Sequence, residues 1–95
     1  MAIYKQTIDT EDTFLGPYVF KQGYFLVSVE FSDDFVGTVT LQRSFNNGKK
    51  PWIDVDNFIV PTETYAVNGG NDIYYRLGIK PGKLDSGSVT VRMGV

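Results

Sequence analysis

The sequence predicts an all-β fold: a single antiparallel β-sandwich, Ig-like or jelly-roll-like, of about seven or eight short strands. Three observations predict it. Apolar and polar residues alternate with a period of two along most of the chain. Turn-forming Gly, Pro, Asn and Asp separate the alternating runs at a spacing of roughly 8 to 12 residues, which is typical of sandwiches. No window has the apolar spacing of an amphipathic helix.

The chain holds 95 residues, which is enough for one domain with one modest core. We therefore expect residues 1–95 to form a single domain. Residues 9–13, Asp-Thr-Glu-Asp-Thr, are an acidic stretch that we expect to be a solvated loop. Residues 1–14 combine apolar Ile3 and Tyr4 with polar residues. They form either an ordinary first strand or an N-terminal arm that reaches a neighbouring subunit.

Five runs show the alternation most clearly, and each places its apolar residues on one face. They are residues 24–31, 37–45, 52–60, 72–80 and 87–95. In the first run, for example, Phe25 and Val27 share the face opposite Ser28. A one-sided apolar face of β-branched and aromatic residues indicates strands buried on one side, which favours two packed sheets. Residues 3–8 and 18–21 are weaker strand candidates.

The turn between the second and third of these runs is the most distinctive loop. Asn47 and Gly48 tolerate positive φ and stand between two alternating runs, which indicates a hairpin. Pro51 belongs before the next strand because proline cannot donate a ladder hydrogen bond. The segment also resembles the Asp-box hairpins of sialidase-type propellers, although Asn46 replaces the usual Asp and Trp52 falls one residue late. A propeller needs several such boxes in a far longer chain, so we interpret the segment as a turn.

The residue types present exclude most catalytic and metal-binding chemistry. The chain has no cysteine and no histidine, so it offers neither thiolate nor imidazole ligands and no imidazole base. Asp54 and Asp56 share a strand face about 6.5 to 7 Å apart, whereas a glycosidase pair normally spans a cleft. Asp33 and Asp34 fall short of the six to eight oxygens of a calcium site. We expect no enzyme, no catalytic residues, no metal and no cofactor.

Charge and hydropathy exclude further classes of partner. The net charge is −2, whereas binding that depends on phosphate neutralisation needs a basic surplus. No apolar run approaches the length of a membrane span, and the first 14 residues contain no apolar core of a signal peptide. We therefore expect no nucleic acid, membrane or small-molecule substrate as a partner, and a chain made in the cytosol without a cleaved signal.

Large aromatic residues with outward parity indicate a contact surface instead. Tyr24 and Tyr74 oppose the apolar faces of their strands, and Trp52 shares the face of Asp54. Such rings add contact area with few rotamers to freeze. The alternative is that Tyr74 packs under a loop and Trp52 covers the end of the sandwich. Arg43 has inward parity, so we expect a bulge beside it or an acidic partner at the end of the sheet.

Two longer stretches carry a family resemblance. They are GTVTLQRSFNNGKKPW and DIYYRLGIKPGKLDSGSVTVRMGV, and they resemble a family of small all-β structural proteins of tailed bacteriophages. In that family a G-TVTLQRSFDGG-TW hairpin precedes a YYRLG…SGTVTVRL hairpin. The resemblance spans residues 23–95. In this chain Asn46, Asn47 and Gly48 replace Asp-Gly-Gly, and the loop to Trp52 is longer by one residue.

The resemblance implies a virion structural protein that binds the outside of the capsid and cements or decorates adjacent coat subunits. Its partners would be the major capsid protein and further copies of itself, as a homotrimer. It would be made in the host cytoplasm and lie on the capsid surface of the virion. Two alternatives stay open: a head–tail connector, tail or fibre-base component, or a carbohydrate-binding β-sandwich module that stacks sugars on Trp52, Tyr24 and Tyr74. The residues that we expect at the interface are Tyr4, Tyr24, Trp52, Tyr74, Arg43 and Arg76.

Overall fold

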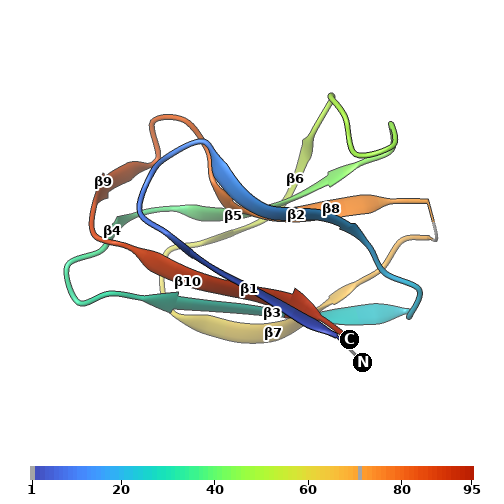
Figure 1. Cartoon of the computed structure of the whole chain (residues 1–95), viewed down its shortest axis with the longest axis horizontal. Coiled ribbons are helices and arrows are strands. Elements are labelled where there is room, and N and C mark those ends of the chain that lie inside the picture. The colour runs from blue at the N-terminus through green and yellow to red at the C-terminus, as the bar shows by residue number, and fades with distance from the viewer. Residues whose placement is uncertain (1, 71) are drawn as a thin grey trace.

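The protein is an antiparallel β-sandwich (Figure 1). The computed structural model describes residues 2–70 and 72–95, which contain ten strands and no helix. In chain order the strands are β1 (Ile3–Ile8), β2 (Thr13–Val19), β3 (Tyr24–Phe31), β4 (Val36–Gly37), β5 (Val39–Ser44), β6 (Ile53–Phe58), β7 (Thr62–Val67), β8 (Tyr74–Ile79), β9 (Leu84–Ser86) and β10 (Val89–Gly94). The predicted all-β class and antiparallel sandwich are confirmed, and the number of strands is higher than expected.

Two four-stranded sheets form the two layers of Figure 1. Sheet A has the strand order β1-β10-β3-β7, and sheet B has the order β2-β8-β5-β6. Strands β4 and β9 form a short separate ladder at one end. All the paired strands are antiparallel. The N-terminal segment supplies β1, which pairs with β10, so both ends of the chain lie at one end of sheet A.

The core lies between the two sheets and is built from the predicted inward faces. Phe25, Val27 and Val29 are each no more than 1% exposed. Their strand alternates between the core and the outside, as a period of two requires. Tyr75 of the facing sheet is 1% exposed, and its hydroxyl accepts a hydrogen bond from the Gly69 N–H at 2.9 Å. The core therefore lies between the two sheets, and the outer faces of the sheets point away from it.

The predicted hairpin joins β5 to β6. Asn47 and Gly48 have φ angles of 56° and 75°, the left-handed conformation that these residue types tolerate. The Lys49 N–H closes the turn on the Asn46 carbonyl at 3.1 Å. Pro51 precedes β6, as its missing N–H requires.

Two strand assignments in the four-stranded sheets differ from the sequence prediction. The strand expected within residues 52–60 is present as β6, which is shorter and ends at Phe58. Strand β7, Thr62–Val67, was not predicted. Strand β2 begins at Thr13, earlier than the expected residues 18–21. Both differences concern strands at the edges of the sheets.

Candidate binding surface

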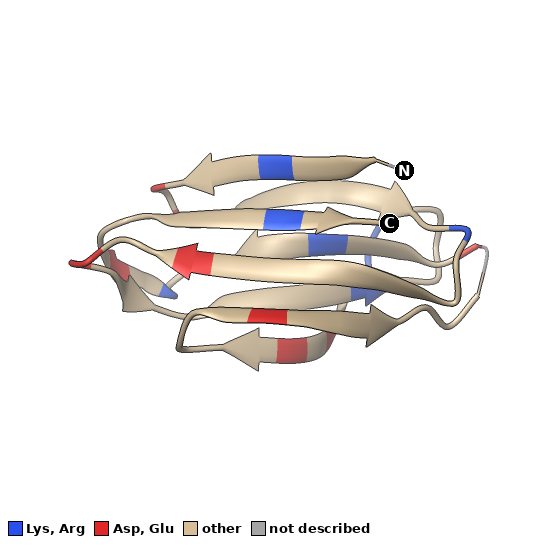
Figure 2. Cartoon of the chain, turned by 90° about the horizontal axis from the view of Figure 1, so that it is seen from below, with Lys and Arg blue, Asp and Glu red and all other residues tan. Residues whose placement is uncertain are grey.

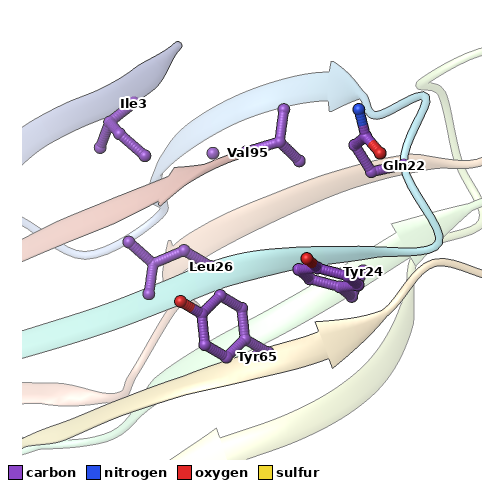
Figure 3. Close-up of a pocket in the computed structure, with 7 residues that line it drawn as sticks. Ile3, Gln22, Tyr24, Leu26, Tyr65 and Val95 are labelled. Atoms are coloured by element: carbon purple, nitrogen blue, oxygen red, sulfur yellow. The ribbon is translucent and has the colours of Figure 1, made fainter. Parts of the chain in front are cut away.

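The outer face of sheet A carries a shallow hollow at the end where the two termini lie (Figure 3). Its volume is about 550 Å³. The residues that line it are Ile3, Gln22, Tyr24, Leu26, Tyr65, Gly94 and Val95. Most of them are apolar, although they face away from the core. Because the core is already closed on the other face of the sheet, the hollow is a surface feature and not a packing defect.

The register of sheet A assembles this hollow from four strands. Ile3 of β1 lies opposite Gly94 of β10, and Gly94 lies opposite Leu26 of β3. Leu26 in turn lies opposite Tyr65 of β7. Cross-strand partners have their side chains on the same face, so the row is continuous across the sheet. The middle of the row is low because Gly94 has no side chain. A Cβ at this position would collide with the backbone of Ala2 and Ile3.

The most exposed residues in this row and in the adjacent Tyr24–Val67 pair are aromatic or aliphatic. Tyr24 is 60% exposed and Tyr65 is 66% exposed. Their ring centroids are 5.4 Å apart and the ring planes are perpendicular, an edge-to-face geometry that fixes both rings without burying them. Val67, opposite Tyr24 on β7, is 81% exposed. We call Ile3, Tyr24, Leu26, Tyr65 and Val67 the apolar patch; contiguous exposed apolar side chains of this kind mark interaction sites.

A row of charged residues lies beside the apolar patch on the same face. Lys5 of β1 and Arg92 of β10 lie opposite each other, and Ser28 and Glu63 continue the row across β3 and β7. Figure 2 shows the resulting asymmetry: Lys and Arg mark the two strands that carry the termini, whereas Asp and Glu mark the strands toward the other edge. Arg92 forms an ion pair with Glu30 on β3. Sheet A is therefore cationic at its β1 edge and anionic at its β7 edge.

The sandwich is open where β6 and β7 lie at the same edge. A cleft of about 360 Å³ there is lined by residues that include Val55, Thr64, Ala66 and Arg43. We call it the edge cleft. Arg43 has the inward direction that its parity predicts, and its guanidinium carbon lies 5.2 Å from the centre of the Phe45 ring. Its buried Nε–H has no hydrogen-bond partner among the described residues.

The two expectations for Arg43 have different outcomes. A bulge is present, but it lies in the neighbouring strand: Leu41 pairs with Asp56 and Gln42 pairs with Asp54, which leaves Val55 as the extra residue of β6. Within residues 2–70 and 72–95, no carboxylate lies at ion-pair distance from the Arg43 guanidinium. The expected acidic partner is therefore not found there.

The outer face of sheet B carries a polar network with a different character. The Arg76 guanidinium lies between two aromatic rings, 3.8 Å from the centre of Phe14 and 4.2 Å from the centre of Trp52. Its Nε–H donates to the Gln42 side-chain carbonyl at 2.8 Å. The Gln42 amide then donates to Asp54 at 2.8 Å. Burial lowers the pKa of the Arg76 guanidinium from its ordinary value. The two rings and the hydrogen bond to Gln42 fix the position of its planar guanidinium.

Asp54 ends this network at the surface. It accepts a hydrogen bond from the Lys80 ammonium at 2.6 Å as well as the one from Gln42. The hydrogen bond from Lys80, followed by the one from Gln42, lowers the pKa of the Asp54 carboxyl. The regular alternation that was expected to place Asp54 and Asp56 on one face is interrupted by the bulge at Val55, since Asp54 pairs with Gln42 and Asp56 pairs with Leu41. Asp56 accepts from the Asn57 N–H and lines the edge cleft.

The predicted interface residues do not gather in one place. Tyr24 alone belongs to the apolar patch. Tyr4 stacks on Tyr18 at the β1–β2 edge, with ring centroids 3.8 Å apart. Tyr74 packs under the β5–β6 hairpin. Its ring is so close to Gly48 that a Cβ on this glycine would lie 3.1 Å from it.

Trp52 and Arg76 lie together on the outer face of sheet B, and Arg43 lies in the edge cleft. The aromatic stacking platform of Trp52, Tyr24 and Tyr74 is therefore not assembled: Tyr24 belongs to β3 in sheet A, whereas Tyr74 belongs to β8 in sheet B.

Four members of the apolar patch, Ile3, Leu26, Tyr65 and Val67, were not among the interface residues expected from the sequence. Tyr65 and Val67 lie on β7, in which only Thr62 and Ala66 are half-buried, so no buried stripe marks the strand in the sequence. Ile3 and Leu26 have outward parity on their strands, opposite the buried Ile8 and Val27. Parity could have identified Ile3 and Leu26 separately. Only the strand order of sheet A places them side by side.

The described residues hold no group of three or more His, Cys, Asp or Glu side chains that could bind a metal ion. Over the same residues, the structure has no helix of the length and hydrophobicity needed to cross a membrane. Comparison of the chain with protein-family models, with curated protein sequences and with solved structures gave no match. The surfaces themselves are therefore the basis for a functional proposal.

Proposed function

We propose that this protein is a structural component of a phage particle. In this proposal it binds the outside of the capsid through the outer face of sheet A and holds adjacent coat subunits together. The observation that carries the proposal is the apolar patch, in which Tyr24 and Tyr65 are 60% and 66% exposed beside a closed core. Neighbouring exposed aromatic side chains of this kind are typical of interaction surfaces.

The magnitude of the contact suits a protein that acts in many copies. Burying a Tyr that is two-thirds exposed contributes about 1 to 2 kcal/mol, so the whole apolar patch supports only moderate affinity for one molecule. Repetition over equivalent capsid sites converts moderate affinity into stable attachment, because linked copies dissociate together. A rigid antiparallel scaffold without reactive residue types meets these requirements.

The phage resemblance contributes to the proposal through the scaffold. The two stretches that carry it include strand β5 with the turn that follows it, and the strands β8, β9 and β10. Apart from Gly94 and Val95, the hollow is lined by residues outside these stretches, on β1, β3 and β7 and before β3. The resemblance thus supports the kind of scaffold, and the apolar patch supports the adhesive role.

The proposal is tested by binding the purified protein to empty, expanded capsids of its phage and measuring the bound fraction by sedimentation. The double variant Tyr24→Ser, Tyr65→Ser should bind at least about ten-fold more weakly, since two buried rings are lost. Phe45→Ser is the matched control, because Phe45 is 59% exposed but lies beside sheet B. Equal binding of both variants, or no binding by the wild-type protein, would contradict the proposal.

Other positions in the particle use the same adhesive chemistry. A head–tail connector, tail or fibre-base component would occur in few copies per particle, whereas a capsid-surface protein would occur at each repeated site. The copy number in purified particles, measured by quantitative mass spectrometry, separates these positions. A carbohydrate-binding role remains a second proposal for the Tyr24–Tyr65 pair alone, and a glycan array without hits would remove it.

A further inference from the structure

We propose that copies of this chain associate head to tail, with the outer edge of β1 in one copy pairing with the outer edge of β7 in the next. The two strands are the edges of sheet A, and each has six residues. Pairing them would join the sheets A of successive copies into one continuous sheet. The inference deepens the proposed function and rests on it in one respect: it names a second copy of the chain as a partner at the edges of the sheet whose outer face is proposed to bind the capsid.

The hydrogen bonds between Ala2 and Val95, at the start of β1, show which residues of β1 direct their backbone N–H and C=O groups away from sheet A. Ala2 and Val95 exchange both backbone hydrogen bonds, at 3.1 and 3.2 Å. Because bonded residues alternate along an antiparallel pair, Tyr4 and the residues in phase with it bond to β10. Lys5 and the residues in phase with it direct their N–H and C=O groups away from the sheet. The outward-bonding residues of β1 are Ile3, Lys5 and Thr7.

The same reasoning identifies the free groups of β7. The Asn68 N–H donates to the Gly23 carbonyl at 3.0 Å, so Ala66 and Thr64, in phase with Asn68, bond to β3. The outward-bonding residues of β7 are Glu63, Tyr65 and Val67. In the described part of the chain, neither set is paired with another strand. Such unpaired edges are templates for strand addition.

The two edges match in direction and in phase. Successive strands of sheet A alternate in direction, so β1 and β7 run opposite ways and meet as an antiparallel pair. One register places Lys5 opposite Glu63 and Ile3 opposite Tyr65. Both of these pairs join an outward-bonding residue to another, so each pair exchanges its two backbone hydrogen bonds. All four side chains lie on the outer face of sheet A.

Charge selects this register over its neighbours. Within its own sheet Lys5 lies opposite Arg92, an unfavourable like-charge pair, and Arg92 is engaged with Glu30. Glu63 lies opposite Ser28. In the parts of the chain that the structure describes, neither Lys5 nor Glu63 has an ion-pair partner. A shift by two residues would place Lys5 opposite Tyr65 or Pro61 and lose the charge pair. The cationic and anionic edges of Figure 2 thus complement each other.

The same register extends the apolar surface. The row that runs from Ile3 through Leu26 to Tyr65 continues into Ile3 of the next copy, so the apolar patches join into one band. On the inner face, Tyr4 of the next copy lies opposite Thr64, which lines the edge cleft. The Tyr4–Tyr18 stack of one copy therefore covers the open edge of its neighbour. Head-to-tail contacts close into a ring when the rotation per copy allows it, and extend as a filament otherwise.

The first test uses sedimentation velocity on purified protein without capsids. Wild-type protein should self-associate, and Lys5→Glu and Glu63→Lys should each weaken association by about ten-fold. The double variant Lys5→Glu, Glu63→Lys should regain it, and so should an equimolar mixture of the two single variants, because opposite charges then meet again. Lys83→Glu and Glu11→Lys are matched controls on exposed loops and should leave association unchanged. A monomeric wild-type protein, unchanged association of the single variants, or a double variant that stays dissociated would overturn the inference.

The second test reads the register directly. The chain has no cysteine, so each introduced thiol is unique. A mixture of Ile3→Cys and Tyr65→Cys should form a disulfide-linked heterodimer, since paired residues lie within disulfide reach. A mixture of Thr7→Cys and Tyr65→Cys, four residues out of register, should not. Equal cross-linking in both mixtures would overturn the register. Neither test involves capsids, so loss of the inference leaves the capsid-binding result to be judged separately.

Discussion

Replacing Arg76 by leucine tests whether the network on sheet B stabilises the fold. The guanidinium lies 3.8 Å from the centre of Phe14 on one side and 4.2 Å from the centre of Trp52 on the other. Leucine keeps apolar contact with both rings but removes the positive charge and the Nε–H. The perturbation therefore isolates the cation–π contacts and the hydrogen bond to Gln42 from simple packing.

The expected loss follows from three contacts. Each cation–π contact at a half-buried site contributes about 0.5 to 1 kcal/mol. The hydrogen bond to the Gln42 side chain, which is 5% exposed, contributes about 1 kcal/mol, and its loss leaves a buried acceptor without a partner. Together these predict a decrease in the free energy of unfolding of about 2 kcal/mol. For a domain of this size that corresponds to a decrease in Tm of about 8 to 16 °C.

Urea unfolding followed by fluorescence measures this loss. Trp52 is the one tryptophan of the chain, so its emission reports both global unfolding and the removal of the cation beside its ring. Arg76→Lys keeps the charge but loses the planar stack, and should lie between the wild type and Arg76→Leu. Lys83→Leu, on an exposed loop, should stay within about 0.5 kcal/mol of the wild type. An unfolding free energy of Arg76→Leu as close to the wild type as that control would refute the reasoning.

Three further predictions concern single residues. Lys80 and Gln42 lower the pKa of Asp54 below its ordinary 3.8, so the stability that Asp54 contributes is present above that pH and is lost as pH falls through the lower folded-state pKa. Urea unfolding at pH 6 and pH 3 should therefore show a smaller decrease for Asp54→Asn than for the wild type, and an equal decrease would contradict this. Gly48→Ala should decrease the unfolding free energy by about 1 kcal/mol or more, because φ is 75° and the new methyl would press on Tyr74; an unchanged urea midpoint would refute it. Leu77→Ala, at a fully buried site, should decrease it by about 3 kcal/mol, and a decrease below that of Gly48→Ala would argue against the described core.

Local sequence was sufficient to predict the strands that the core stabilises. The central strands β3, β5, β8 and β10 alternate apolar and polar residues in the sequence, because the apolar residues of each strand face the other sheet. The β5–β6 turn was also predictable, since Asn47 and Gly48 tolerate the positive φ angles that they adopt. These features depend on neighbours in sequence.

Features that depend on distant pairing were not predictable. Strand β7 has only one paired neighbour and little burial, so no buried stripe marks it. The bulge at Val55 arises from the match between β5 and β6, and the parity of Arg43 gave only its direction. Tyr24 was correctly placed outward, but its contact with Tyr65 requires the strand order of sheet A. The apolar patch is a property of that order.

Protection of the apolar patch on assembled particles is the most direct test of the adhesive account. Hydroxyl-radical labelling followed by mass spectrometry should modify Tyr24, Tyr65 and Phe45 readily in the free protein, because all three are at least 59% exposed. On particles, Tyr24 and Tyr65 should become protected while Phe45 stays reactive. Protection of Phe45 with Tyr24 and Tyr65 still labelled would place the contact on the other sheet and contradict the account.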